Sequence, residues 1–389
     1  MGKIIFLFSA STIAFLMRIL INARFLLSEK LEGIGLYTYE LVRRWVKDHP
    51  EDRFVLCFDR PFDDRFLFGE NVEPIILRPP ARHPLLFIWW FEIGIPKVYR
   101  AKKCDVFFSP DGFLSLSQTV TKSLLVIHDL AYLHYPQHLG KWMLWYYQQF
   151  IPRFVTKASH IITVSKSSRE DIIQHFPETS GKISAVYNGV RDDLQPITED
   201  KQISIRKQYS NGSPYFFSLG AIHPRKNLVG VLKAFQIFKS QSNTDTKLLI
   251  AGRFAWKVND LKEHLVNHRF KRDIILLGYI PDKLLGQLLG ASLGLIYISH
   301  LEGFGLPITE AMACGTPVIT SNLSSMAEIA GDAAVLVAPD DHQEIADGMS
   351  RLQRDPVFAD DLVERGLKRY KMFDWDRAAI TTYDILRRL

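Results

Sequence analysis

The chain has 389 residues, of which 47% are hydrophobic and 23% charged, a composition that is ordinary for a soluble globular protein of about two to three domains. Its 3 cysteines are far apart and form no CxxC pair, which argues against a disulfide framework and against a zinc site, so we expect a reducing, cytoplasmic compartment. The net charge of +6 suits an anionic substrate or an anionic membrane face, and because no nucleic-acid motif is present, no nucleic-acid partner is expected.

Residues 1–16 are predicted to be an upstream extension. Lys3 precedes an apolar run, as in a signal peptide, but the run is too short to span a bilayer comfortably. Met17 and Arg18 then open a strand, so we expect the working chain to begin at Met17. An intact mass of the natural protein that starts at Met1 would refute this hypothesis.

From Arg18 onward, strands alternate with helices. Strand Arg18–Asn22 is followed by a glycine loop and by helix Tyr37–Lys47, in which apolar residues recur at helical spacing. Gly33 and Gly35 at the helix start would let backbone amides approach a phosphate or a sugar, although a plain connecting loop is the alternative. Further strands are predicted at Phe54–Phe58, Pro74–Leu77, Asp105–Ser109, Leu124–Ile127 and His160–Val164.

Two helical stretches, Leu85–Lys103 and Trp142–Phe154, are rich in aromatic residues, and the first also carries several basic ones. We interpret most of these residues as packing against the sheet. The alternative is an amphipathic surface that contacts a membrane holding a lipid-linked acceptor.

His128 and Asp129 follow an apolar strand, at the position where doubly wound sheets carry function. Histidine can donate to a sugar hydroxyl or share a proton near neutral pH. A loop histidine with a purely structural hydrogen bond is the alternative, but the strand end and the neighbouring Asp129 favour function. His134 in the same loop is interpreted as structural.

A polar segment over residues 191–213 leads into a second α/β unit. Strand Tyr215–Leu219 is followed by a loop with adjacent Arg225 and Lys226, and then by helix Leu228–Phe238. Both cations in such a loop could face a diphosphate, arginine as a two-pronged donor and lysine as a point charge. Two solvated surface charges are the alternative.

The remainder of this half repeats the same alternation. The polar residues Ser321, Asn322, Ser324 and Ser325 are expected to cap a helix at Met326, with a nucleotide contact as the alternative. Met372–Leu389 reads as an amphipathic segment. Strands are predicted at Lys247–Ala251, Ile274–Leu277, Gly294–Ser299, Pro317–Thr320 and Ala333–Val337, and a helix at Asp282–Leu289.

The chain is organised around the segment His300–Thr316. Glu302 lies in a glycine loop and Glu310 in a short buried helix, Ile308–Cys314. A helix N-terminus at the carboxyl edge of a parallel sheet attracts anionic ligands, and carboxylates accept paired hydrogen bonds from neighbouring hydroxyls of a hexose or a ribose. For Glu310, a carboxylate that complements the helix dipole is the alternative.

The string EGFGLPITEAMACGTPVITSN, residues 302–322, resembles almost letter for letter the paired-glutamate signature of the retaining GT-B glycosyltransferases, known as glycosyltransferase group 1 or family 4. The strings GIGLYTYEL at 33–41, HDL at 128–130 and HPRKNL at 223–228 are also similar to that family, and those of the N-terminal domain resemble its mannosyltransferase branch. One departure is Ala221, where many members carry a basic residue.

The resemblance implies an α/β protein of GT-B architecture, with two Rossmann-like domains whose parallel sheets face across a cleft. The acceptor-binding domain would span residues 17–200, the nucleotide-sugar domain 201–370, and residues 371–389 would cross back to the first. The implied catalytic residues are His128 and Glu302, and Glu310 would hold the ribose. The implied diphosphate-binding residues are Arg225, Lys226, Gly33 and Gly35, and the implied sugar- and nucleotide-binding residues are Asp129, Gly303, Phe304, Gly305, Leu306 and Glu310.

The implied reaction is retaining transfer of a hexose from GDP-mannose or a UDP-sugar to a glycan or lipid-linked acceptor in cell-surface polysaccharide synthesis. No metal and no cofactor are expected, because cationic residues would balance the diphosphate. The enzyme would work in the cytoplasm, at the inner face of the cytoplasmic membrane if it contacts lipid. A sugar-nucleotide epimerase of the same fold and a non-catalytic carbohydrate-binding protein are the alternatives.

Overall fold

The computed structural model describes residues 16–28, 31–253 and 259–389. The predicted upstream extension therefore lies outside the described residues except for Leu16. The structure divides into two compact units: the first reaches Leu125 and includes Leu386–Leu389, and the second spans Val126–Ile385. The expected α/β class is confirmed, because the described residues form two parallel sheets, of 7 and 6 strands, with helices between the strands.

The first sheet has the strand order β3-β2-β1-β4-β5-β6-β7. Its central strands are buried throughout, as expected for parallel strands that are covered on both faces. Reversal of the strand order on either side of β1 creates the kind of edge at which doubly wound sheets bind ligands. The strands are β1 Arg18–Asn22, β2 Arg53–Phe58, β3 Val72–Ile76, β4 Val106–Ser109, β5 Ser123–Val126, β6 His160–Thr163 and β7 Ile183–Ala185.

The second sheet has the strand order β10-β9-β8-β11-β12-β13. In this sheet too the strand order reverses, here between β8 and β11. These two strands pair in parallel through Gly294–Phe216 and Leu295–Phe217. The loops that follow these two strands therefore leave from the same edge. The strands are β8 Tyr215–Leu219, β9 Lys247–Ala251, β10 Ile274–Gly278, β11 Gly294–Tyr297, β12 Val318–Ser321 and β13 Val335–Val337.

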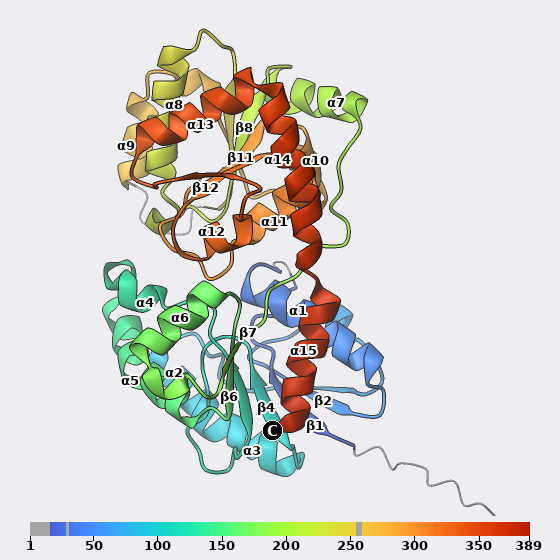
Figure 1. The fold of residues 1–389 in the computed structure, drawn as a ribbon. Helices are drawn as coiled ribbons and strands as arrows, with labels where there is room; N and C mark the ends of the chain where they lie inside the picture. The colour runs from blue at the N-terminus through green and yellow to red at the C-terminus, as the bar shows by residue number, and fades with distance from the viewer. Residues whose placement is uncertain (1–15, 29–30, 254–258) are drawn as a thin grey trace, which may run out of the picture. The chain divides into compact units, whose positions relative to one another are not determined.

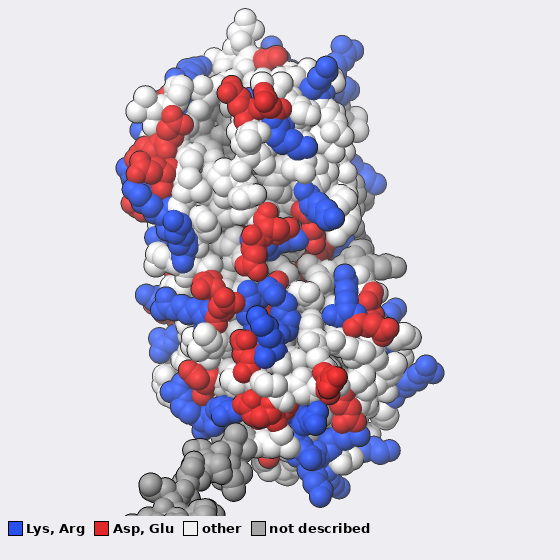
Figure 2. All heavy atoms as spheres, turned by 90° about the vertical axis from the view of Figure 1, so that its right-hand side faces the viewer, with Lys and Arg blue, Asp and Glu red and all other residues white. Residues whose placement is uncertain are grey.

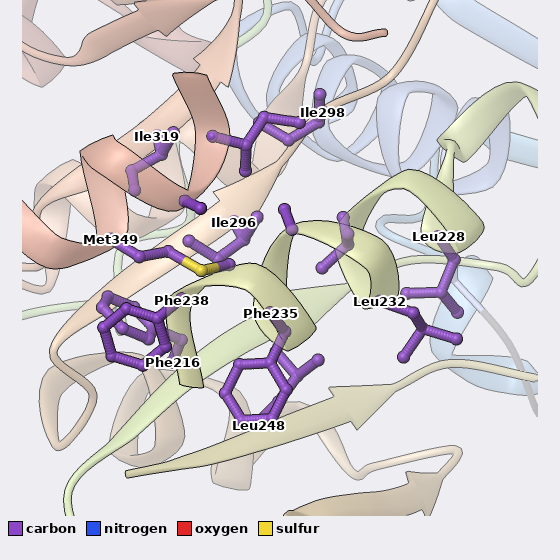
Figure 3. Packing of buried hydrophobic residues seen from close by; sticks show 14 of the residues in the cluster. Phe216, Leu228, Leu232, Phe235, Phe238, Leu248, Ile296, Ile298, Ile319 and Met349 are labelled. Carbon is purple, nitrogen blue, oxygen red and sulfur yellow. The ribbon is translucent and has the colours of Figure 1, made fainter. Parts of the chain in front are cut away.

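Helices cover both faces of the second sheet. Figure 1 shows α8 and α9 to one side of β11 and α10 to the other. On the first side, α8 and α13 bury Phe235, Phe238 and Met349 against strand residues such as Phe216 and Ile296, and Figure 3 shows these side chains interdigitating. This core holds β8 and β11 in place, and so it positions the loops that follow these two strands. The helices of this half are α7 Glu199–Ser210, α8 Leu228–Gln241, α9 Asn259–Asn267, α10 Asp282–Gly290, α11 Leu306–Ala313, α12 Ser324–Ala330, α13 His342–Arg354, α14 Pro356–Arg369 and α15 Trp375–Arg388.

The expected helix Leu85–Lys103 is present but is not uniform. A π-helical turn, Trp90–Gly94, separates α2 from α3. Pro96 has no N–H to donate to the carbonyl of Glu92, so the α-helical ladder is interrupted there. The earlier helices are α1 Ile34–Asp48, α2 Pro84–Trp89, α3 Ile95–Ala101, α4 Ala131–His134, α5 Lys141–Lys157 and α6 Lys166–His175.

Two further features of the chain are its thiols and the hydropathy of its helices. Cys57, Cys104 and Cys314 are free and buried. Within the described ranges, no helix is both long and apolar enough to cross a bilayer.

Candidate active site

Arg225 and Lys226 lie in the loop that follows β8. They belong to a single 3-10 turn, Pro224–Lys226, which His223 caps by accepting the amide N–H of Arg225 on Nδ1 at 3.2 Å. Asn227 then takes a left-handed conformation and caps α8 by accepting the Gly230 amide. Because these caps hold the backbone on both sides, the two cationic side chains leave the turn in a defined direction.

Glu302, in the loop after β11, pairs with both cations. Its Oε1 atom lies 3.2 Å from Nη1 of Arg225 and 2.6 Å from Nζ of Lys226. Arg225 also donates to the carbonyl of Leu301, and its own carbonyl accepts the amide of His300 at 2.9 Å. The structure thus brings together three predicted site residues from two neighbouring strand ends.

The charges of this cluster are strongly coupled because it is largely buried. Burial alone would raise the pKa of Glu302, but Lys226 and Arg225 more than offset it and lower that pKa to about 2. Burial lowers the pKa of Lys226, and Glu302 more than reverses this, so the pKa lies above its ordinary value. All three groups are therefore charged at neutral pH, with a net charge of +1.

Tyr297 is a member of this cluster that the sequence reasoning missed. It ends β11, its hydroxyl accepts a hydrogen bond from Lys226 Nζ at 2.6 Å, and the ammonium lies 4.8 Å from the ring centroid. A small hollow at the end of β8 is lined by Gly220, Ala221, Lys226 and Tyr297, among others. A polar side chain at the carboxyl end of an apolar strand was the signal that could have identified Tyr297.

Hydroxyl groups brace the loop that carries Glu302. Ser324 and Ser325 each donate to the carbonyl of Glu302 at 2.8 Å, and Ser325 also lies 3.0 Å from the carbonyl of Phe304. The expected helix cap is wrong: α12 starts at Ser324 itself, the residue before it is Leu323, and neither serine caps the helix. Their hydroxyls satisfy loop carbonyls instead, which fixes the backbone on which Glu302 stands.

Gly303 and His128 lie in direct backbone contact. A Cβ on Gly303 would lie 2.3 Å from the carbonyl oxygen of His128, so this position accepts glycine only. Ser168 donates to the carbonyl of Gly303 at 3.2 Å. Asp129 accepts the amide of Ala131 at 2.9 Å. Burial lowers the pKa of Arg225, but the charge of Glu302 and then that of Asp129 more than reverse this effect. The structure therefore places His128 and Asp129 beside the glutamate loop.

Glu310 lies on α11, which begins after Gly305, a residue with a left-handed φ of 100°. Its side chain is buried, and burial raises its pKa to about 7, with Asp282 and Asp193 adding to the increase and Arg191 opposing it. Arg191, another residue that sequence reasoning did not assign, pairs with Asp282 at 2.9 Å. The two predicted glutamates thus have opposite electrostatic environments.

Phe304 and Leu306 differ in how they could contact a ligand. The Phe304 ring is buried, with its centroid 5.5 Å from that of Phe373 and 6.2 Å from that of Tyr187, so any contact it makes with a donor must come from its backbone. Leu306 opens α11 and is half-buried. Their assignment to the donor site stays a prediction.

Gly33 and Gly35 have local structural reasons to be glycine. Gly33 precedes α1 with a φ of 50°, and a Cβ on Gly35 would lie 2.5 Å from the carbonyl oxygen of Phe25. These residues belong to the first compact unit. Their role at a diphosphate stays a prediction.

Comparison with known protein families agrees with this geometry. A family model described as "Glycosyl transferases group 1" matches residues 200–369, and one described as "Glycosyltransferase Family 4" matches residues 31–194. The chain is similar to O-antigen chain mannosyltransferase B of Escherichia coli, with 28% identity over 372 residues that cover 92% of this chain and 97% of that protein. It is 26% identical over 260 residues to the O-antigen chain mannosyltransferase RfbU of Salmonella typhimurium, covering 67% of this chain and 66% of that protein.

Solved structures share the fold at low sequence identity. Anabaena HepE, crystallised with UDP and glucose, has a TM-score of 0.74 and 16% identity, and the match covers 96% of this chain and 100% of that one. WaaG, a glycosyltransferase involved in lipopolysaccharide biosynthesis, has a TM-score of 0.74 and 13% identity, with 95% and 99% coverage. The expected fold, two Rossmann-like domains with parallel sheets as in GT-B glycosyltransferases, is therefore confirmed.

Proposed function

Because the chain belongs to the group 1, family 4 glycosyltransferases of the GT-B fold, we propose that it transfers a hexose, with mannose as the first candidate, from a nucleoside diphosphate sugar to a glycan or lipid-linked acceptor. GDP-mannose is the preferred donor and a UDP-hexose the alternative. The preference for mannose is supported by the names of two relatives, both O-antigen mannosyltransferases.

The observation that carries this proposal is the ion cluster of Arg225, Lys226 and Glu302. Cleavage of the bond between sugar and diphosphate places additional negative charge on the leaving oxygens. Two cations in a mostly buried site stabilise such charge more strongly than they would in water. We infer that the diphosphate binds beside Arg225 and Lys226, and that the N–H groups of the surrounding loops add to this stabilisation.

Glu302 keeps both cations paired before the donor binds, at 3.2 and 2.6 Å. In our proposal, the diphosphate takes over part of this pairing, and the carboxylate is then available to accept hydrogen bonds from the donor sugar. His128, which lies beside the same loop, contacts the sugar from the other side. The transfer retains the anomeric configuration, and we assign no covalent nucleophile.

Glu310 binds the ribose hydroxyls in this proposal. With its pKa raised to about 7 by burial, the carboxyl group is neutral in part of the molecules at neutral pH. It can then both donate and accept a hydrogen bond, which suits a pair of neighbouring hydroxyls.

The acceptor side of the proposal includes contact with the cytoplasmic face of a membrane. Trp142 and Trp145 on α5 are 70% and 42% exposed, and exposed indole rings favour the bilayer interface. The face drawn in Figure 2 mixes basic and acidic side chains, so the net positive charge is not gathered there. Sedimentation with anionic vesicles tests the contact: Trp142→Ala should reduce it, and equal sedimentation of both proteins would refute it.

Nucleotide binding tests the diphosphate site. Titration with GDP, UDP and the corresponding nucleosides should show a preference for the diphosphates that Lys226→Ala reduces by about tenfold or more, since it removes a charge-assisted contact. Lys233→Ala, on the exposed side of α8, is the matched control and should leave the preference unchanged. Equal diphosphate affinity in wild type and Lys226→Ala would overturn the assignment.

Incubation of the enzyme with GDP-mannose or a UDP-hexose separates the proposed reaction from its alternatives. With acceptor present, transfer should yield a product of the same anomeric configuration, measurable by NMR. An epimerised donor formed without acceptor would identify an epimerase. Donor affinity that is unchanged in Glu310→Ala, together with no turnover, would identify a carbohydrate-binding protein.

A further inference from the structure

A cluster of metal-ligating side chains lies apart from the ion cluster, where α4 meets α6. Asp171 and His175 are one turn apart on α6, and His134 ends α4. His134 Nε2 lies 2.9 Å from both carboxylate oxygens of Asp171, and His175 Nδ1 lies 3.2 Å from Oδ1. The two imidazole rings are nearly perpendicular, with centroids 5.3 Å apart.

We propose that His134, Asp171 and His175 bind one divalent transition-metal ion of the zinc class. The cysteines of this chain are buried and separate, so this site would use imidazole and carboxylate donors instead. Two imidazoles and one carboxylate form a common zinc ligand set, with a fourth position left for water. Calcium and magnesium prefer sites made of oxygen atoms alone, so they do not fit this donor set.

The spacing of the ligand atoms supports the proposal. One ligand atom from each of the three residues lies within 4.8 Å of the others. Ligands of a tetrahedral zinc ion, at bond lengths of about 2.0–2.1 Å, are about 3.3 Å apart. The nitrogen–oxygen distances from His134 and from His175 to Asp171, 2.9 and 3.2 Å, are already close to that value, so both pairs are spaced as ligands of one ion would be.

The site is accessible and its hydrogen bonds are replaceable. The three side chains are 35%, 22% and 33% exposed, in the order His134, Asp171, His175. His175 Nδ1 also lies 2.9 Å from the carbonyl oxygen of Asp171. An ion would replace these contacts: each imidazole would turn a ring nitrogen without a proton toward the metal and carry its proton on the other ring nitrogen.

A second group of potential ligands, His49, Glu51 and Asp52, provides an internal comparison. There, the guanidinium of Arg387 lies 3.2 Å from Glu51 and 2.9 Å from Asp52. Because a cation already pairs with both carboxylates, this group is a poor metal site. His49 is therefore a suitable control position.

The ion would act as a clamp and not as a catalyst. α4 begins two residues after Asp129, so an ion that ties His134 to α6 would restrict the segment that starts at His128. This inference is independent of the proposed sugar transfer, because binding and stability report on it directly.

Zinc ion alone is the probe, applied at pH 8 to tag-free, full-length protein that has been stripped with a chelator. Competition with a chromophoric chelator should show one ion per chain, and thermal unfolding should shift upward, since the ion binds the folded state. His134→Gln and His175→Gln should each weaken binding by about tenfold or more and abolish the shift. His49→Gln should change neither, and millimolar magnesium should not compete.

Three results would overturn the proposal. They are zinc binding that survives in His134→Gln and His175→Gln, zinc binding lost only in His49→Gln, and equal competition by magnesium. Circular dichroism of the metal-free variants checks that they fold. If a glutamine variant fails to fold, Asp171→Asn replaces it, since it keeps the side-chain shape but removes the charge.

Discussion

Substituting each glutamate of the site by glutamine should change stability with opposite sign. Burial raises the pKa of Glu310 to about 7 from an ordinary 4.5, whereas Lys226 and Arg225 outweigh burial and lower that of Glu302 to about 2. Each difference corresponds to roughly 3 kcal/mol. Glutamine keeps the shape of both side chains and removes their titration.

The sign for Glu310 follows from proton linkage. Between about pH 4.5 and 7 the unfolded chain has lost this proton and the folded chain keeps it, so the free energy of unfolding falls as pH rises. Glu310→Gln removes this loss. At pH 8 the variant should be more stable than wild type by roughly 3 kcal/mol, and at pH 4 the difference should nearly vanish.

The sign for Glu302 is reversed. Its folded pKa is the lower one, so its contribution is present above about pH 4.5 and is lost as pH falls toward 2. Glu302→Gln leaves two largely buried cations without their carboxylate and should lose roughly 3 kcal/mol at pH 8. This loss should shrink below pH 4.5.

Urea denaturation of the three proteins at pH 4 and pH 8 measures both effects, and Glu263→Gln, at an exposed position on α9, is the control. The reasoning is refuted if Glu302→Gln and Glu310→Gln shift stability in the same direction at pH 8. It is also refuted if the gain in Glu310→Gln is the same at both pH values.

The remaining predictions concern the backbone and the thiols. Gly303→Ala should reduce the rate of transfer at least about tenfold, because its Cβ would lie 2.3 Å from the His128 carbonyl oxygen and displace the glutamate loop. Gly181→Ala, with nothing within 4 Å of its Cβ, is the control. Equal transfer rates for the two variants would contradict this prediction. Ser325→Ala removes the hydroxyl that lies 2.8 and 3.0 Å from two loop carbonyls and should destabilise the protein by about 1–3 kcal/mol. Ser240→Ala, on the exposed side of α8, is the control and should change the stability little. Denaturation midpoints of the two variants and the wild type measure the difference. Burial raises the pKa of Cys104 and Cys314 to about 12, so a thiol reagent should modify the native protein slowly and the urea-unfolded protein at once; rapid reaction of the native protein would show that these thiols are accessible.

Local sequence patterns predicted the strands well because each is a short apolar run between turn residues. β8 and β9 have the predicted limits Tyr215–Leu219 and Lys247–Ala251. The boundary between α2 and α3 was harder to predict from the sequence, because the π-helical turn between them depends on which carbonyl Pro96 leaves without a hydrogen bond. Element type follows from neighbouring residues, whereas these details depend on hydrogen bonds that span a full turn.

The pairing within the site was only partly predictable. The motif around Glu302 identified the loop, and the Arg225–Lys226 pair identified the second strand end. What the sequence did not indicate is that both cations pair with the one carboxylate of Glu302, or that Ser324 and Ser325 hold the loop instead of capping α12. Such contacts join residues far apart in the chain, and they depend on side-chain distances that no residue spacing encodes.

The composition of the first compact unit has a consequence for biosynthesis. The unit reaches Leu125 and then lacks its last part until Leu386–Leu389 has been made, which at about 5–20 residues per second takes roughly 13–50 s of translation. During that interval Asp52 cannot form its ion pair with Arg387, which lies 2.9 Å away in the complete structure. Asp52 therefore acquires this partner only when synthesis of the chain is nearly complete, and a chain truncated before Arg387 would never form this ion pair.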